Sequence, residues 1–121
     1  MYKRQTKEPK FTQAENIEIA TYLNGLPGTS QILVDDATAY PIVAFTNNLK
    51  TLIMPYQDSY LSAIESPENY ADFMLIANDR NQANGYTQLN NSYLEILKAS
   101  GHAVNLQKAY QTDNWTLYRL R

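Results

Sequence analysis

The chain has 121 residues, a length that suits one domain. Hydrophobic residues make up 44% and charged residues 18%, as in folded globular domains, and a formal net charge of −2 argues against a nucleic-acid partner. The sequence has no cysteine, which excludes disulfides and thiolate chemistry, and its one histidine, His102, is too few for a histidine zinc site. No apolar run approaches the roughly 18 residues that a membrane-spanning helix needs.

The first five residues, Met1–Gln5, resemble an artefact of sequencing rather than part of the fold. A transposon end used in sequencing libraries, read from a GTG start codon, encodes them, and a natural basic N-terminus is the alternative. A polar segment with Pro9 follows and is typical of a linker. We therefore expect residues 1–11 to be adapter-derived residues plus a linker, residues 12–121 to be one α/β domain, and the natural protein to extend further upstream.

The first half of the domain predicts a helix followed by two strand–helix units. Thr12 and Glu15 have the spacing of a capping box, and Ile19, Ala20 and Leu23 follow at helical spacing. Asp58 is placed to cap a later helix. In chain order we expect a helix at 13–24, a strand at 31–34, a helix at 38–45, a strand at 51–54 and a helix at 59–65.

The second half predicts the most apolar strand of the chain and a closing hairpin. Residues 71–77 are apolar at successive positions, which is typical of a strand buried on both faces, so we expect this strand inside the sheet. A polar loop at 78–85, a helix at 92–100 ended by Gly101, and strands at 103–110 and 115–120 follow. The predicted fold class is α/β: a three-layer sandwich with a mostly parallel sheet and a C-terminal antiparallel hairpin.

Three aspartates are weak candidates for ligand binding. Asp35 and Asp36 follow the first predicted strand and Asp58 follows the second, at the sheet edge where open α/β sheets bind ligands. Adjacent carboxylates can bind Mg²⁺ or Ca²⁺, but Asp36 can equally cap the next helix and Asp35 can bond loop amides. The structural interpretation is favoured. The residues indicate no catalytic group, no cofactor and no metal ion.

Tyrosine is abundant, with ten residues. Those on apolar faces are expected in or near the core: Tyr22, Tyr40, Tyr60, Tyr93 and Tyr118. Those in predicted loops can line a sugar-binding surface or a partner interface, since aromatic side chains anchor interfaces: Tyr56, Tyr70 and Tyr86.

The order of several short segments resembles one family of membrane enzymes. The segments are Ile19–Leu23, Gln31–Asp36, Tyr40–Ala44, Tyr56–Tyr60, Ser66–Pro67, Ala71–Ala77 and Trp115–Leu120. They resemble the C-terminal extracytoplasmic domain of bacterial polytopic membrane glycosyltransferases similar to dolichyl-phosphate-mannose–protein mannosyltransferases, that is, glycosyltransferase family 39-like proteins. The resemblance covers residues 12–121 and rests on segments that mostly determine the fold.

The resemblance implies a role for this chain without implying catalysis. Family members use a polyprenyl-phosphate sugar, and their catalytic acids lie near N-terminal membrane helices, a region without a counterpart here. The chain is then an accessory domain on the extracytoplasmic face, next to the membrane helices of its own parent chain and a carbohydrate or protein acceptor. The alternative is a free-standing cytoplasmic α/β module that binds a small ligand or resembles a receiver, for which Asp35 and Asp36 are the supporting residues.

Deleting Met1–Gln5 should leave the melting temperature unchanged, because adapter-derived residues have no reason to pack against the domain. Thermal unfolding of the full chain and of the shortened chain, followed by circular dichroism, measures this. A loss of several degrees would show that the five residues belong to the fold.

Overall fold

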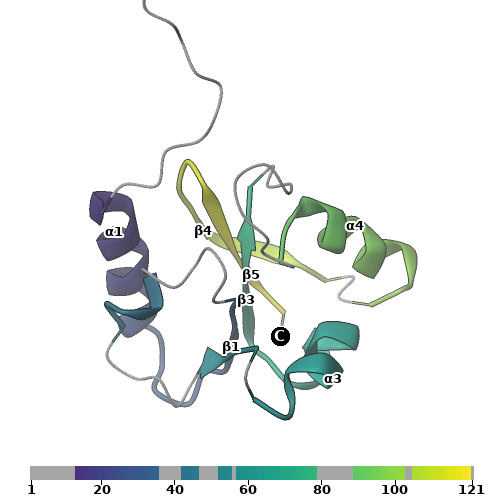
Figure 1. Ribbon diagram of the computed structural model, residues 1–121. Coiled ribbons are helices and arrows are strands. Elements are labelled where there is room, and N and C mark those ends of the chain that lie inside the picture. The colour runs from purple at the N-terminus through teal and green to yellow at the C-terminus, as the bar shows by residue number, and fades with distance from the viewer. Residues whose placement is uncertain are drawn as a thin grey trace, which may run out of the picture.

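The computed structural model describes residues 13–35, 42–46, 52–55, 57–78, 89–102 and 105–120. They form a mixed five-stranded sheet with helices packed against it, so the fold is of the α/β class (Figure 1). The elements in chain order are α1 (Gln13–Asn24), β1 (Ile32–Leu33), β2 (Leu52–Ile53), α3 (Tyr60–Glu65), the short 3₁₀ helix η2 (Pro67–Asn69), β3 (Phe73–Ala77), α4 (Asn91–Ala99), β4 (Gln107–Gln111) and β5 (Trp115–Arg119).

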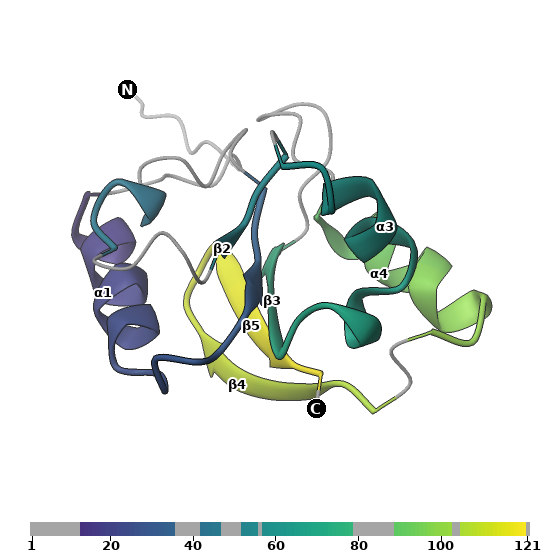
Figure 2. The same cartoon turned by 90° about the horizontal axis from the view of Figure 1, so that it is seen from below.

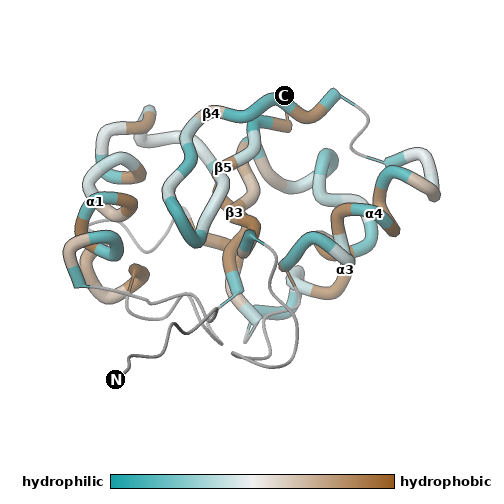
Figure 3. Tube along the Cα trace, turned by 90° about the horizontal axis from the view of Figure 1, so that it is seen from above, coloured by the Kyte–Doolittle hydropathy of each residue, from teal (hydrophilic) through white to brown (hydrophobic). Residues whose placement is uncertain are grey.

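Strand β3 lies at the centre of the sheet, whose order is β2-β1-β3-β5-β4. It pairs in parallel with β1, which itself pairs in parallel with β2, and it pairs antiparallel with β5. Its residues are apolar throughout, whereas the edge strand β4 is mostly hydrophilic, as the colouring in Figure 3 shows. The prediction that residues 71–77 lie inside the sheet is therefore confirmed.

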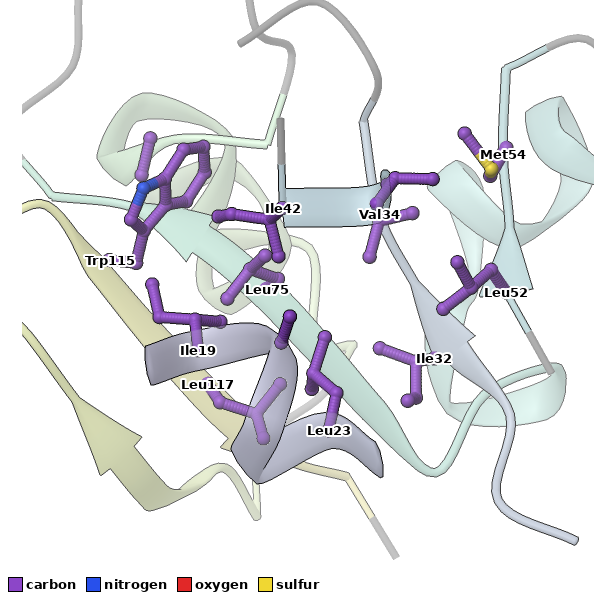
Figure 4. Close-up of a cluster of buried hydrophobic side chains, with 13 residues drawn as sticks. Ile19, Leu23, Ile32, Val34, Ile42, Leu52, Met54, Leu75, Trp115 and Leu117 are labelled. Atoms are coloured by element: carbon purple, nitrogen blue, oxygen red, sulfur yellow. The ribbon is translucent and has the colours of Figure 1, made fainter. Parts of the chain in front are cut away.

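The two faces of β3 contribute to two separate hydrophobic cores. Figure 2 shows α1 on one side of the sheet and α3 and α4 on the other. Leu75 belongs to the α1-side core, where Ile19, Leu23, Trp115 and Leu117 surround it (Figure 4). The alternate residues of β3 face the other way, because side chains along a strand point to opposite faces. They meet the helices in the α3–α4-side core, which contains Met74, Ile76, Tyr60, Ala63, Leu94 and Leu97.

The predicted antiparallel hairpin is confirmed, but its first strand is shorter than the expected range of 103–110. Strand β4 begins at Gln107, which pairs with Arg119, the last residue of β5. Because β5 ends there, Asn105 and Leu106 have no strand to pair with, and residues 103 and 104 of the predicted strand lie outside the described residues. The register also shifts between Lys108 and Tyr110, so Ala109 forms a bulge in the edge strand.

Strands β1 and β2 are also shorter than predicted, with two residues each. Their pairing continues for one further hydrogen bond, from the Val34 amide to the Ile53 carbonyl. The apolar residues around each strand are buried nevertheless, which is why the hydrophobic pattern predicted longer strands than the backbone pairing supports.

Helix α1 has the predicted bounds, although Thr12 of the expected capping box lies outside the described residues. Of the helix predicted at 38–45, residues 42–45 are described. Ile42 and Val43 are helical and buried, whereas Ala44 and Phe45 form an exposed turn, so the helix ends earlier than predicted. Helix α4 begins at Asn91, one residue earlier than predicted, because the Asn90 side chain caps it by accepting from the Tyr93 amide at 3.1 Å.

The prediction that Asp58 caps α3 is wrong. The N-cap residue is Ser59, which has helical backbone angles and forms no capping hydrogen bond through its side chain. The preceding turn is already wound, since the Tyr60 amide donates to the Gln57 carbonyl at 3.1 Å. This backbone bond satisfies a donor that a carboxylate cap would otherwise serve, and Asp58 remains exposed.

A buried carboxylate fastens α1 to the turn of the C-terminal hairpin. Glu15, only 9% exposed, accepts hydrogen bonds from the Thr112 hydroxyl at 2.5 Å and the Asn114 amide at 2.8 Å. Its second oxygen accepts from Asn114 Nδ2 at 2.6 Å. The end of β3 joins the same turn, because Asn78 Nδ2 donates to the Thr112 carbonyl at 3.1 Å. Three elements distant in sequence are thus held together by polar contacts.

Replacing Glu15 by Ala should destabilise the protein by about 2–3 kcal/mol, because it leaves buried hydrogen-bond donors of Asn114 without their acceptor. The matched control is Glu18→Ala in the same helix, since exposed Glu18 accepts a hydrogen bond from Tyr110 of the same hairpin. That variant should unfold at nearly the wild-type urea concentration. Equal losses in the two variants would show that the buried contacts are not what stabilises the hairpin.

Candidate functional site

The two predicted aspartates that the structure describes lie at the carboxyl edge of the parallel strands but in different environments. Asp35 follows β1 and is 5% exposed, whereas Asp58 follows β2 on an exposed turn, and Asp36 lies outside the described residues. Among the residues that the structure describes, no three His, Cys, Asp or Glu side chains gather as a metal site. The two described carboxylates therefore offer no shared cation site by themselves.

The polar residue that organises this edge is Gln57. Its amide nitrogen donates to the Leu52 carbonyl at 3.0 Å, and its side-chain oxygen accepts from the Met54 amide at 3.3 Å. The side chain thereby satisfies backbone groups at the end of β2 and stabilises the turn between β2 and α3. In the segment at 56–60, which contributes to the family resemblance, Gln57 thus has a structural role that the sequence analysis did not identify.

A second titratable cluster lies between α4 and η2. His102 follows Gly101, whose φ of 84° ends α4 in the left-handed region, and the His102 amide donates to the Leu97 carbonyl. This turn brings His102 Nδ1 to 2.7 Å from Glu68 Oε2. The Tyr93 hydroxyl nearby donates to the Ile64 carbonyl at 2.6 Å. Each of these contacts links α4 to the α3–η2 segment, so the cluster has a bracing role.

The most ligand-like feature lies at the opposite, amino edge of the parallel strands. A groove of about 580 Å³ opens there between the C-terminal end of α1 and strands β3 and β4. Its apolar lining consists of Tyr22, Leu26, Phe73 and Ala109, which are partly buried and pack against the α1-side core. The polar residues around them are Thr29, Ser30, Asp72, Gln107, Lys108 and Arg119. A cavity of this volume is within the size range of small-ligand sites, and its lining is divided about evenly between polar and apolar residues.

The strand register determines which polar side chains share the face of this groove. Phe73 pairs with Arg119, and Arg119 pairs with Gln107, so the three form one row across β3, β5 and β4. Residues directly opposite each other on paired strands point to the same face of a sheet. Lys108 also borders the groove, but it pairs with Tyr118, which packs in the α3–α4-side core, so its side chain is directed to the opposite face. The cation facing the groove is therefore Arg119.

The Tyr22 ring is held rigidly at the groove. It stacks on the Tyr110 ring with a centroid separation of 4.3 Å and an interplanar angle of 15°. The Tyr22 hydroxyl donates to the Ala109 carbonyl at 3.3 Å, and the Tyr110 hydroxyl donates to Glu18. This hydrogen bond to Glu18 is the main cause that raises the pKa of Tyr110 above its ordinary value. Tyr110 thus packs against one face of the Tyr22 ring and fixes its orientation.

The predicted burial of the tyrosines is confirmed where the residues are described, whereas the role of Tyr70 in a sugar-binding surface or partner interface stays a prediction. Tyr60 is buried and Tyr22, Tyr93 and Tyr118 are half-buried, while Tyr70 is exposed. The others lie outside the described residues: Tyr40, Tyr56 and Tyr86. The groove itself was not predicted. The sequence predicts Gln107 and Arg119 only as residues of two strands. The register between β4 and β5 shows that both lie on the same face of the sheet.

Comparisons with protein-family models, with curated proteins and with solved structures find no match for this chain. Within the part of the chain that the structure describes, no helix combines the length and apolar character required to cross a membrane.

Replacing Tyr93 by Phe should make stability less sensitive to alkaline pH. Burial, with a smaller contribution from the charge of Glu68, raises the pKa of Tyr93. The folded protein therefore holds this proton more tightly than the unfolded chain, whose tyrosines ionise near pH 10. The resulting stabilisation is complete below about pH 10 and is lost as the pH rises toward the higher folded-state value.

The measurement is urea unfolding at pH 8, 9.5 and 11 for wild type, Tyr93→Phe and the exposed control Tyr70→Phe. Tyr93→Phe should be less stable at pH 8, because it loses the bond to the Ile64 carbonyl, and should lose less further stability between pH 9.5 and 11. Identical losses in the three proteins over that interval would contradict the assignment.

Proposed function

We propose that this chain is the C-terminal accessory domain of a bacterial membrane glycosyltransferase that uses a polyprenyl-phosphate sugar, and that it is not catalytic by itself. One observation carries the proposal. The segments Gln31–Asp36, Ala71–Ala77 and Trp115–Leu120, three of those on which the family resemblance rests, contain β1, β3 and β5. These strands adjoin one another at the centre of the sheet. The resemblance therefore describes a connected structural unit, which supports a common fold.

The proposed role is to hold an acceptor outside the membrane. Transfer from a lipid carrier requires an acid–base carboxylate beside a membrane-embedded donor. The candidate carboxylates suit other tasks, since Asp35 is buried at the end of β1 and Asp58 lies on an exposed turn. The domain would contact the membrane helices of its own parent chain at the extracytoplasmic face and would present a carbohydrate or protein acceptor to them.

The same proposal includes the architecture of the complete domain. For residues 12–121 we propose a three-layer α/β sandwich with a mostly parallel sheet. The positions of α1 on one side and of α3 and α4 on the other support the three layers. Two of the described strand pairings are parallel and two are antiparallel. Strand β4 runs antiparallel to β5 and therefore in the same direction as β3. Four of the five described strands thus share one direction, which supports a mostly parallel sheet.

A free-standing cytoplasmic module that binds a small ligand is the second candidate. Buried Asp35 directly after β1 favours it, because open α/β sheets bind ligands beyond the carboxyl ends of their strands. The upstream DNA distinguishes the two candidates. Several apolar segments of about 20 residues before Thr6 support the membrane parent, whereas a start codon with a ribosome-binding site near Thr6 supports the free-standing module.

The isolated chain should transfer no sugar when supplied with a lipid-phosphate sugar and an acceptor, as measured with a radiolabelled donor. In the membrane-bound parent, removing the domain should reduce transfer, because the acceptor is no longer positioned. The double variant Asp35→Asn/Asp36→Asn should instead keep substantial activity and lose only about 1–2 kcal/mol of stability, as expected for lost capping contacts. Complete loss of transfer by a folded, membrane-inserted double variant would identify the aspartates as a functional site.

A further inference from the structure

The groove at the amino edge combines flat apolar surfaces with planar polar groups. Tyr22 and Phe73 present aromatic rings, and the row formed with Phe73 by Arg119 and Gln107 places a guanidinium and a carboxamide on the same face. A carboxamide offers two donors and an acceptor, and a guanidinium offers five donors in a fixed fork. The groove therefore suits a ligand that has an apolar face and many hydroxyl groups along its rim.

The charges of the groove favour a neutral ligand. Arg119 and Asp72 are both in the lining, and their formal charges cancel. The Asp72 carboxylate is held in place, because its Oδ2 accepts from the Gln31 amide at 2.9 Å. Lys108 is a third charged residue at the groove, but its register with Tyr118 directs its ammonium group to the opposite face, so the charged groups on the groove's own face are those of Arg119 and Asp72. A polyanion in the groove would be attracted by Arg119 but repelled by Asp72, so the groove does not favour it.

The edge strand beside the groove disfavours an extended peptide as the ligand. A peptide that adds a strand to a sheet needs a regular row of outward backbone groups. Ala109 interrupts that row in β4 because it forms the bulge, and its carbonyl already accepts a hydrogen bond from the Tyr22 hydroxyl. Bulges of this kind protect edge strands against pairing. Between the two acceptor classes considered above, the structure therefore favours carbohydrate.

We propose that the groove is a binding site for a neutral oligosaccharide, with a sugar ring lying on Tyr22 and its hydroxyl groups bonded to Gln107 and Arg119. This inference builds on the proposed function, in which the bound glycan is the acceptor. Tyr110 acts as a positioning residue, because its stacked ring and its bond to Glu18 support Tyr22 from behind. A pre-oriented ring loses little conformational entropy on binding, which favours even a shallow site.

The test titrates the full chain with mannotriose and, separately, with cellotriose, and follows backbone amide resonances by NMR. Glycerol serves as the comparison, because it has hydroxyl groups but no ring face. Resonances should shift at the end of α1, in the segment 26–30, and around Phe73, Gln107 and Arg119, with at least one trisaccharide and not with glycerol. Shifts of equal size with glycerol, or none with either trisaccharide, would overturn the proposal.

Three single variants locate the site. Arg119→Ala and Gln107→Ala remove groups on exposed positions and should each weaken trisaccharide binding about tenfold. Lys108→Ala is the matched control, since it removes a cation from the same strand on the opposite face, and should bind as wild type does. If Lys108→Ala weakens binding as much as Arg119→Ala, the ligand is held by general charge and the groove assignment fails.

A fourth variant tests the aromatic surface separately from the fold. Tyr22→Phe keeps the ring and loses the bond to Ala109, so it should retain most of the affinity, whereas Tyr22→Leu should lose it. Unchanged amide spectra away from the groove show that each variant is folded. Equal affinities for Tyr22→Phe and Tyr22→Leu would exclude stacking on this ring.

The outcomes separate this inference from the proposed function. Trisaccharide binding in the groove, together with a parent enzyme that transfers sugar normally without the domain, would keep the binding site and overturn the accessory role. A parent that depends on the domain, together with a groove that binds neither trisaccharide, would keep the accessory role and overturn the site.

Discussion

The burial of one strand on both faces determines how the rest of the molecule is arranged. Phe73–Ala77 is hydrogen-bonded to β1 on one edge and to β5 on the other, and its alternate side chains enter two different cores. Such a strand cannot leave either face open to water without exposing several apolar residues. Helices must therefore cover both sides, with α1 on one and α3 and α4 on the other (Figure 2).

The first helix and the turn of the C-terminal hairpin meet on the α1 side of this sheet. Glu15 and Asn114 are 99 residues apart in sequence, yet they form two hydrogen bonds in a buried position. Tyr22 and Tyr110 stack further along the same helix and hairpin. The groove is built from these same two elements together with the start of β3, so it exists only once the first helix has docked against the last hairpin.

Periodic apolar patterns allowed most elements to be predicted, because burial and backbone pairing coincide for α1, β3 and β5. Predictions failed where a local contact decided the outcome, as at Asp58, whose capping role is taken by a backbone bond from Tyr60 to Gln57. The groove was not predictable at all. Gln107 and Arg119 become neighbours only through strand register, and a bulge at Ala109 shifts that register in a way that no residue pattern reveals.

The proposed binding mode couples ligand binding to the docking of the hairpin. Any ligand that contacts Tyr22 and Gln107 together bridges α1 and β4, and so binds only the molecule in which these elements are joined. Mass action then stabilises that docked form in proportion to ligand occupancy. The hydrogen bonds of Glu15 and the stacked rings of Tyr22 and Tyr110 join the same helix and hairpin. In the proposed binding mode, the stability of the fold and the affinity for the ligand therefore depend on one set of contacts. The register between β4 and β5 places Gln107 beside Arg119, and the register between β5 and β3 places Arg119 beside Phe73, so two strand pairings determine which side chains face the groove.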